Sequence, residues 1–198
     1  TSSTTGLATT NLPLGVVAET ADMVIGNGGI LTANASTVRV NGVTMTGGTS
    51  GTITVTTGAW TITNGNWNTS GIGSTYTQGT GIVRFDATVT ITMLSTDNTF
   101  DDVEILTGTT TLGSAIVVTN DLLIFPNNSG TLTTSASNFD ITAGIVTVAV
   151  TGTLTANAST ITVNGNWTSV AGTFNIGTST VIFGATASIS AASSSSFY

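Results

Sequence analysis

From residue 29 onward, the chain alternates apolar and hydroxylated residues in short runs. Pairs such as Ile53/Val55, Val146/Val148 and Ile161/Val163 are each separated by a single threonine. A period of two places alternate side chains on opposite sides of a β-strand. Runs of this kind recur every eight to twelve residues, and no segment shows the apolar spacing of a helix. We therefore expect an all-β protein with essentially no α-helix.

The strand pattern is repeated at a larger scale. The heptapeptide LTANAST at residues 31–37 returns 123 residues later, at residues 154–160. Further along, Asn66-Trp67 matches Asn166-Trp167 at an offset of 100, and the segment 83–85 matches 181–183 at an offset of 98. Repetition of this kind is typical of stacked architectures. It indicates two divergent copies of a unit of about 100 residues.

The two offsets differ by 23 residues, and this difference decides between fold classes. It matches one coil of a β-solenoid, because short stacked repeats are about 20–30 residues long. The extra segment, near residues 43–59, reads as a strand between glycines. A stack gains a whole turn easily, whereas a sandwich core does not. We predict a single-stranded β-solenoid, a right-handed parallel β-helix. The alternative is an antiparallel β-sandwich filament subunit, because Asn-Gly pairs also form hairpin turns.

The repeat divides the chain into three parts. Residues 29–99 form the first unit with its extra turn, and residues 100–198 form the second unit. Residues 1–28 do not fit the repeat. They are an irregular lead-in strand, a coil that caps the stack, or an arm that pairs with a neighbouring subunit.

Composition limits the partners. Threonine and serine make up a third of the chain, and the net charge is −7 with only Arg39 and Arg84 as cations. Nucleic acids and anionic membranes require clustered basic residues, so we expect neither partner. No apolar run reaches the roughly 18 residues of a membrane span. We expect a secreted, extracellular protein whose signal peptide is removed or lies outside this sequence.

The chain has no Cys, His or Lys, which excludes the usual nucleophile–base pairs. We therefore expect no enzymatic activity and no cofactor. Asp101, Asp102 and Glu104 form the one acidic cluster and are weak candidates for Ca²⁺, which prefers oxygen ligands. The alternative is a solvated strand entry. Arg84 with Asp86 nearby, and Arg39, are expected to form surface ion pairs of little energetic value.

Two further groups of residues are candidates for glycan chemistry. Trp67 and Trp167 occupy matching repeat positions and either stack on sugar rings or pack as wedges at a corner. Five Asn-x-Ser/Thr sequons are possible N-glycosylation sites, at Asn34, Asn68, Asn127, Asn157 and Asn166.

The second copy orders its motifs as FDDVEI at residues 100–105, Gly-Asn-Trp at 165–167 and TVIFG at 180–184. This order resembles the Thr/Gly/Asn-rich repeats of microbial cell-surface β-helical proteins of the filamentous-haemagglutinin and adhesin class. The resemblance covers roughly residues 29–198, with Asp86 where the second copy has Gly184.

The resemblance implies an extracellular structural or adhesive role in a surface layer, filament or adhesin. Its partners would be copies of the chain, joined through strand edges, and surface glycans. It carries over no catalytic residue. Two other functions remain open: a donor-strand-complemented pilus or thread subunit, and a carbohydrate-binding module that uses Trp67 and Trp167.

Overall fold

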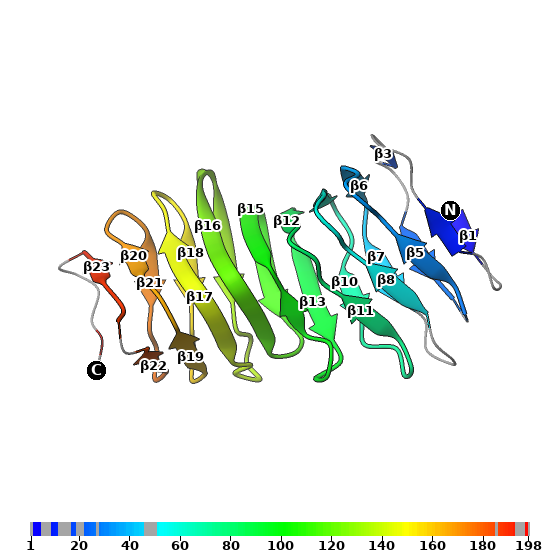
Figure 1. The fold of residues 1–198 in the computed structure, drawn as a ribbon. Coiled ribbons are helices and arrows are strands. Elements are labelled where there is room, and N and C mark those ends of the chain that lie inside the picture. The colour runs from blue at the N-terminus through cyan, green and yellow to red at the C-terminus, as the bar shows by residue number, and fades with distance from the viewer. Residues whose placement is uncertain are drawn as a thin grey trace.

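The computed structural model describes residues 2–4, 9–11, 17–18, 22–26, 28–45, 51–184, 186–192 and 197. Side chains are described from residue 22 onward, except for those of residues 126–128. The strands stack into an elongated rod with the two termini at opposite ends (Figure 1).

The fold is a right-handed parallel β-helix, as the sequence predicts. Every strand pairing between described residues is parallel, from β1 with β4 to β20 with β23. No helix occurs among the described residues. The alternative of an antiparallel sandwich is therefore wrong. The Asn-Gly pairs form corners of the coil, and the chain does not reverse direction at them.

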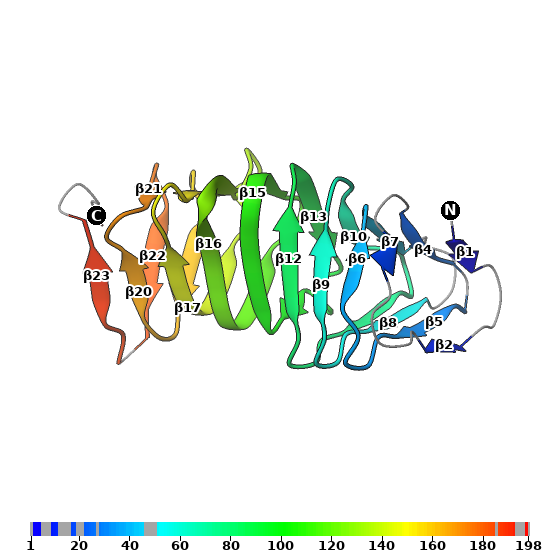
Figure 2. The same cartoon turned by 90° about the horizontal axis from the view of Figure 1, so that it is seen from above.

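Each turn of the helix contributes one strand to each of three faces. Face 1 is seen from above in Figure 2. It consists of β3 (Val17–Ala18), β6 (Val38–Val40), β9 (Ala59–Ile62), β12 (Ile82–Asp86), the start of β15 (Asp102–Leu112), the middle of β16 (Ile116–Thr133), the end of β17 (Ile141–Val148), β20 (Trp167–Ser169) and β23 (Ile189–Ala191).

The other two faces follow in chain order. Face 2 consists of β1 (Ser2–Thr4), β4 (Met23–Ile25), β7 (Val43–Met45), β10 (Trp67–Thr69), β13 (Val89–Met93), the ends of β15 and β16, β18 (Thr153–Thr155) and β21 (Thr173–Asn175). Face 3 consists of β2 (Thr9–Asn11), β5 (Ile30–Thr32), β8 (Thr52–Thr54), β11 (Thr75–Thr77), β14 (Thr99–Phe100), the starts of β16 and β17, β19 (Thr160–Val163) and β22 (Thr180–Phe183).

The described parts of residues 1–28 belong to the same stack. Strands β1 and β4 pair with each other, while β2 pairs with β5 and β3 with β6. These segments supply strands to all three faces within their own chain. Whether this region caps the stack, leads into it or pairs with a neighbouring subunit stays a prediction.

The length of a turn agrees with the difference between the two sequence offsets. Thr63 and Val40, which are hydrogen-bonded across neighbouring turns, lie 23 residues apart in the chain. Other hydrogen bonds between neighbouring turns span 17 residues, for Asn98 and Ala115, to 25 residues, for Ala149 and Ile124. The 23 residues after Gly42, residues 43–65, contain β7, β8 and β9, one strand from each face. The difference between the offsets is therefore one complete turn.

The two copies nevertheless sit on different faces, which the sequence alignment did not predict. Trp67 lies on face 2, between Val43 and Ile91, whereas Trp167 lies on face 1, between Val146 and Ile189. On face 2, the strand that lies five turns after β10 is β21. Trp167 lies on β20, the strand that precedes β21 in the chain, and therefore falls on face 1 instead of face 2. The heptapeptide shows the same shift, from face 3 on β5 to face 2 on β18.

The Asn-Trp motif makes the same corner on either face. The carbonyl of Asn66 accepts a hydrogen bond from the Val43 N–H, and its Oδ1 accepts one from the Thr90 N–H at 2.8 Å. Asn166 repeats both bonds: its carbonyl accepts from the Val146 N–H, and its Oδ1 accepts from the Ser188 N–H at 3.1 Å. The motif thus ties three successive turns together wherever it occurs.

Inward-facing apolar side chains fill the rod, and the matched aromatic residues form two clusters of the same design. Trp67 and Phe100 lie 5.7 Å apart between ring centroids, and Trp167 and Phe197 lie 5.6 Å apart. Edge-to-face pairs of this kind contribute roughly 0.5–1.5 kcal/mol each beyond their buried area. The first cluster consists of Trp67, Tyr76, Phe85 and Phe100, with Trp60 packed edge-to-face against Trp67 as an additional member. The second consists of Trp167, Phe174, Phe183 and Phe197.

Removal of one whole turn tests this architecture. Deletion of residues 43–65 removes β7, β8 and β9 and joins β6 directly to the corner before β10. Because backbone pairing joins each turn only to its neighbours, the shortened protein should keep its β-type circular dichroism and cooperative urea unfolding, with a smaller m-value.

The matched control is deletion of residues 43–54, which removes β7 and β8 but keeps β9. In this variant β9 follows β6 directly, so β9 and all later strands fall one or more faces away from their native partners. The variant should therefore lose cooperative unfolding. Equal behaviour of the two deletions would contradict a fold built from whole turns.

Candidate functional site

The tryptophans face the interior and do not stack on glycans. Trp60, Trp67 and Trp167 are each 0% exposed. On the neighbouring strands, Trp67 is flanked by Val43 and Ile91, and Trp167 by Val146 and Ile189. These neighbours also point inward, and side chains at paired positions lie on the same side of a sheet, so both indoles lie inside the rod. The prediction of sugar stacking at Trp67 and Trp167 is therefore wrong, and the alternative of packing applies.

The buried indoles differ in their hydrogen bonds. Trp167 Nε1 donates to Ser169 Oγ at 2.8 Å, two residues further along β20. The equivalent pair on β10 is Trp67 and Thr69, but neither Trp67 Nε1 nor Thr69 Oγ1 has a partner among the described residues. Buried polar atoms without partners reduce stability. The indole N–H at the centre of the first cluster therefore lacks the hydrogen bond that its counterpart in the second cluster makes.

The acidic residues at the entry to face 1 each contact the adjacent turn. Asp101 Oδ1 accepts a hydrogen bond from Thr119 Oγ1 at 3.1 Å, and Asp102 Oδ1 accepts one from Asn120 Nδ2 at 2.8 Å. Glu104 Oε2 is paired with Arg84 Nε. The three carboxylates therefore do not converge on one point. Among the described residues, no group of three acidic side chains is arranged to hold a metal ion.

A further carboxylate joins this acidic region from the next turn. Burial raises the pKa of Asp121 above its usual value, and the charges of Asp102 and Asp101 raise it further. The Asp121 N–H also donates to Asp102 Oδ1 at 3.0 Å. Charge repulsion between successive turns is thus concentrated at this corner of the rod.

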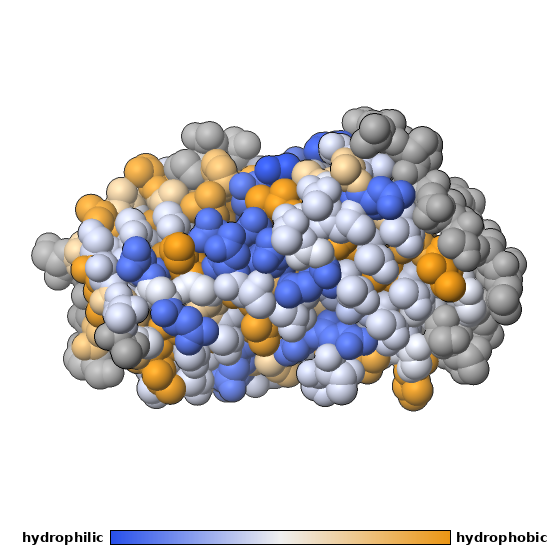
Figure 3. Space-filling view, in the orientation of Figure 1, coloured by the Kyte–Doolittle hydropathy of each residue, from blue (hydrophilic) through white to orange (hydrophobic). Residues whose placement is uncertain are grey.

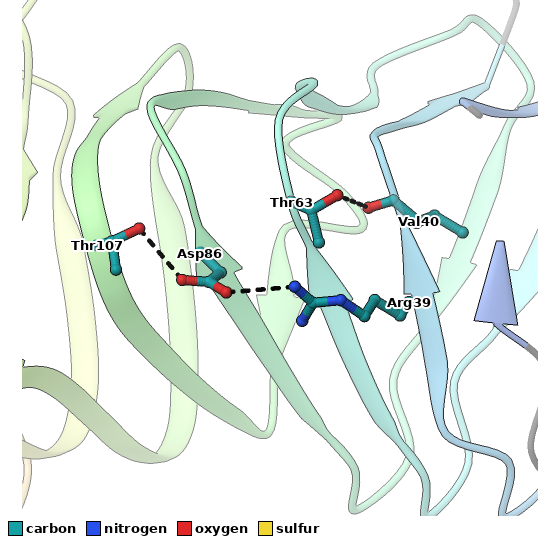
Figure 4. Close-up of polar contacts among 5 residues, drawn as sticks. All are labelled: Arg39, Val40, Thr63, Asp86 and Thr107. Atoms are coloured by element: carbon teal, nitrogen blue, oxygen red, sulfur yellow. Dashed lines mark hydrogen bonds and ion pairs between the residues drawn. The ribbon is translucent and has the colours of Figure 1, made fainter. Parts of the chain in front are cut away.

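Both arginines lie on face 1 and pair along the rod axis. Arg39 Nη2 lies 3.6 Å from Asp86 Oδ2, two turns away, and Thr107 Oγ1 donates to the same carboxylate at 3.2 Å (Figure 4). In the intervening turn, Thr63 Oγ1 donates to the Val40 carbonyl at 3.1 Å. The sequence placed Asp86 beside Arg84, but Asp86 pairs with Arg39. These partly exposed pairs contribute little stability, about 0–1 kcal/mol each.

Three sequons lie at accessible positions. Asn34 and Asn166 are exposed, and Asn68 is half-buried. The Oδ1 atoms of Asn68 and Asn166 accept hydrogen bonds, from Ser70 and Ser188 respectively, which leaves their Nδ2 atoms for attachment of a glycan. Glycosylation at these sites stays a prediction.

The remaining two sequons differ. Asn157 Nδ2, the atom to which a glycan would be attached, donates at 3.3 Å to Thr133 Oγ1, at 3.2 Å to Thr134 Oγ1 and at 3.1 Å to the Ser135 carbonyl. Glycosylation there would break these contacts between turns, so the structure disfavours it. The side chain of Asn127 lies outside the described residues.

The sequence analysis missed a regular array of threonines on face 2. Thr109, Thr131, Thr153 and Thr173 are in register across four turns. A second column beside them, two positions further along each strand, consists of Thr90, Thr111, Thr133 and Thr155. The signal was present in the sequence, because Thr-x-Thr recurs at a constant spacing, at residues 109–111, 131–133 and 153–155.

Apolar side chains at the C-terminal end of the described stack are exposed although their sequence equivalents are buried. Ile189 on β23 is 51% exposed, whereas its equivalent Ile91 is 0% exposed and lies beneath Leu112 of the next turn. Phe183 is likewise half-buried, whereas Phe85 is fully buried. The last described turn therefore presents a surface that the middle of the rod covers with a further turn.

Charged side chains are rare on the rod, because the sequence holds only 2 basic and 9 acidic residues. Figure 3 shows a side of the rod on which pale and blue residues predominate and orange apolar residues are scattered. The described part of the chain holds no α-helix with the length and apolarity that a membrane crossing requires.

The two indole sites allow a matched test of buried hydrogen bonding. Ser169→Ala should destabilise the protein by about 1–3 kcal/mol, because it leaves Trp167 Nε1 buried without an acceptor. Thr69→Val removes a hydroxyl without a partner and should leave stability unchanged or slightly higher. Urea unfolding of both variants measures the difference, and an equal loss from both would contradict the assigned bonds.

Asp121 provides a test by pH. Its folded-state pKa lies above the unfolded value, so its ionisation costs stability as pH rises through that interval and throughout neutral pH. Asp121→Asn should therefore raise the melting temperature at pH 7 but not near pH 3, where most carboxyl groups are protonated. Asp97→Asn, at the preceding corner between β13 and β14, is the control. A gain that persists unchanged at low pH would exclude repulsion as its cause.

Comparisons with protein-family models, with curated proteins and with solved structures found no match to this chain. The resemblance to microbial surface adhesins thus remains a prediction from the sequence. The geometry of the rod, its ends and its faces is the basis for assigning a function.

Proposed function

We propose that this protein is an extracellular structural component of a microbial surface layer, filament or adhesin, and that it assembles end to end with copies of itself. The observation that carries the proposal is the parallel β-helix itself, in which successive turns extend the strand ladders of their neighbours. At the last described turn, inward-facing apolar side chains are more exposed than their equivalents inside the rod.

The geometry of the two ends supports assembly between copies. Each of the three faces begins with a strand of the first described turn, which are β1, β2 and β3, and finishes with β21, β22 and β23. Strands at the edge of a parallel ladder keep unpaired N–H and C=O groups, which pair readily with another strand. Because the three faces have the same order at the first and last described turns, a second copy placed against the rod can continue each face. Such a heterologous contact repeats without closing and produces a filament.

The side chains at the C-terminal end add an apolar driving force. Val181, Phe183 and Phe197 are only partly covered, and Ile189 is half-exposed. Burial of apolar area contributes about 25 cal/mol per Å². A turn placed over this end would bury these residues as Val103, Leu112 and their neighbours bury the equivalent residues of the first copy.

Composition supports an extracellular location and a passive role. The surface depends on hydroxyl and amide groups, and the sequence lacks the Cys, His and Lys residues on which many active sites depend. Glycan attachment at Asn34, Asn68 or Asn166 and adhesion to surface glycans belong to the same proposal. The sandwich-type pilus subunit and the carbohydrate-binding module with stacking tryptophans no longer fit, because the fold is parallel and the indoles are buried.

Assembly is tested by electron microscopy and light scattering of the purified protein. We expect fibres whose width equals that of a single rod. Ile189→Lys places a charge inside the open end and should shift the population to monomers, because burial of an unpaired charge is costly.

The control is Ile182→Lys, at a site that is 49% exposed but lies on the outward side of β22. It should leave the fibres intact. Fibres that are unaffected by Ile189→Lys, or a wild-type protein that stays monomeric at all concentrations, would refute assembly through this end.

A further inference from the structure

On face 2, threonine and asparagine fill the outward side over more successive strands than on the other two faces, although face 3 also has outward threonines on β8 and β11. Face 1 carries the charged residues Arg39, Arg84 and Glu104, and face 3 exposes the apolar residues Ile30 and Ile182. From β7 to β21, every outward-facing residue of the face 2 strands is threonine or asparagine: Thr44, Asn68, Thr90, Thr92, Thr109, Thr111, Thr131, Thr133, Thr153, Thr155, Thr173 and Asn175. One side of the rod is thus free of both charges and large apolar side chains along these strands.

The threonines of face 2 form a two-dimensional lattice. Neighbouring strands of a sheet are about 4.7–4.9 Å apart, and alternate residues of one strand are about 6.6 Å apart. From β15 through β16 and β18, the pairs 109/111, 131/133 and 153/155 stay in register. The irregularity in the pairing of β15 with β16 lies earlier, between Ile105 and Thr107, at the corner that precedes the face. The array is therefore regular where the threonines occur.

Hydrogen bonds from neighbouring residues orient part of the lattice. Thr133 Oγ1 accepts from Asn157 Nδ2 at 3.3 Å and from the Ser135 N–H at 3.4 Å. Thr155 Oγ1 accepts from Asn175 Nδ2 at 3.3 Å. Threonine is stiff at χ1 because it is branched at Cβ, and an accepting hydroxyl keeps its own hydrogen for an outside acceptor. The hydroxyl and methyl positions of the array are thus set in advance.

The chemistry of face 2 limits the classes of ligand that it can bind. Without cations on these strands, the face offers nothing to phosphate or to an anionic membrane. Without an outward-facing aromatic ring it offers no platform for stacking on sugars, since all three tryptophans are buried. What remains is a rigid grid of hydroxyl and methyl groups with two fixed repeats. A surface that matches it must itself be periodic, uncharged and able to donate and accept hydrogen bonds at every site.

We propose that face 2 binds the surface of ice. Water oxygens on a prism face of hexagonal ice also form a rectangular array that repeats in two directions, on the same length scale as the threonine lattice. The methyl groups fit between the water molecules, and the hydroxyls join their hydrogen-bond network. A preorganised array loses little conformational entropy on binding. This inference is independent of end-to-end assembly, because face 2 runs along the side of the rod.

Thermal hysteresis and ice-crystal shaping of the purified protein test the inference. We expect the wild-type protein to open a gap between melting and freezing temperatures and to produce faceted crystals. Thr153→Lys introduces a long charged side chain in the middle of the lattice and should abolish both effects. The matched control is Thr147→Lys in the preceding strand, an outward-facing threonine of face 1, which should retain both effects.

A second variant guards against loss of folding. Thr131→Tyr disrupts the lattice by size without adding charge and should also abolish hysteresis, with circular dichroism confirming that both face 2 variants remain folded. Ice shaping no greater than that of an unrelated soluble protein would overturn the inference, and so would equal losses from Thr153→Lys and Thr147→Lys. Binding of the wild-type protein to microcrystalline cellulose in a pull-down, with no effect on ice, would also overturn it.

Discussion

The in-register stacking of parallel strands is the constraint on which the rest of the structure depends. Within a column such as Val83, Val103, Leu122 and Val146, each residue points inward because its partner in the preceding turn does. A shift of one residue would turn every apolar side chain of a strand toward solvent. Variation is therefore confined to the corners, where lengths differ between turns, and to changes of a whole turn.

The same constraint explains which features are visible in the sequence. Alternation identifies the strands, and the difference between the two offsets identifies the turn, because both depend only on local spacing. The face on which a strand lies depends on how many strands precede it, and corners of variable length hide that number. For this reason the alignment paired Trp67 with Trp167 correctly as a motif but not as a position in the rod.

Contacts between turns were less predictable than the strands. Alternation placed Asp102 and Glu104 on the same side of their strand, but the partners of these residues lie about one turn away in the sequence. Asn120 is 18 residues from Asp102, and Arg84 is 20 residues from Glu104. For Trp67 and Trp167 the sequence left both packing and sugar stacking open, because their type and repeat position fit either role. The register decided between these roles, and it also supplied the threonine columns of face 2.

The offset of the two copies by one face has a geometric consequence for any rod built from this unit. A unit that stops one strand short of five turns delivers each of its features about a third of a circle away from the preceding copy. Duplication of the unit therefore generates a screw, in which the same corner motif and the same aromatic cluster appear on successive sides. In a longer rod of such units, no side would differ permanently from the others. Each feature of the unit would recur at successive angles around the rod axis and would be accessible from every direction.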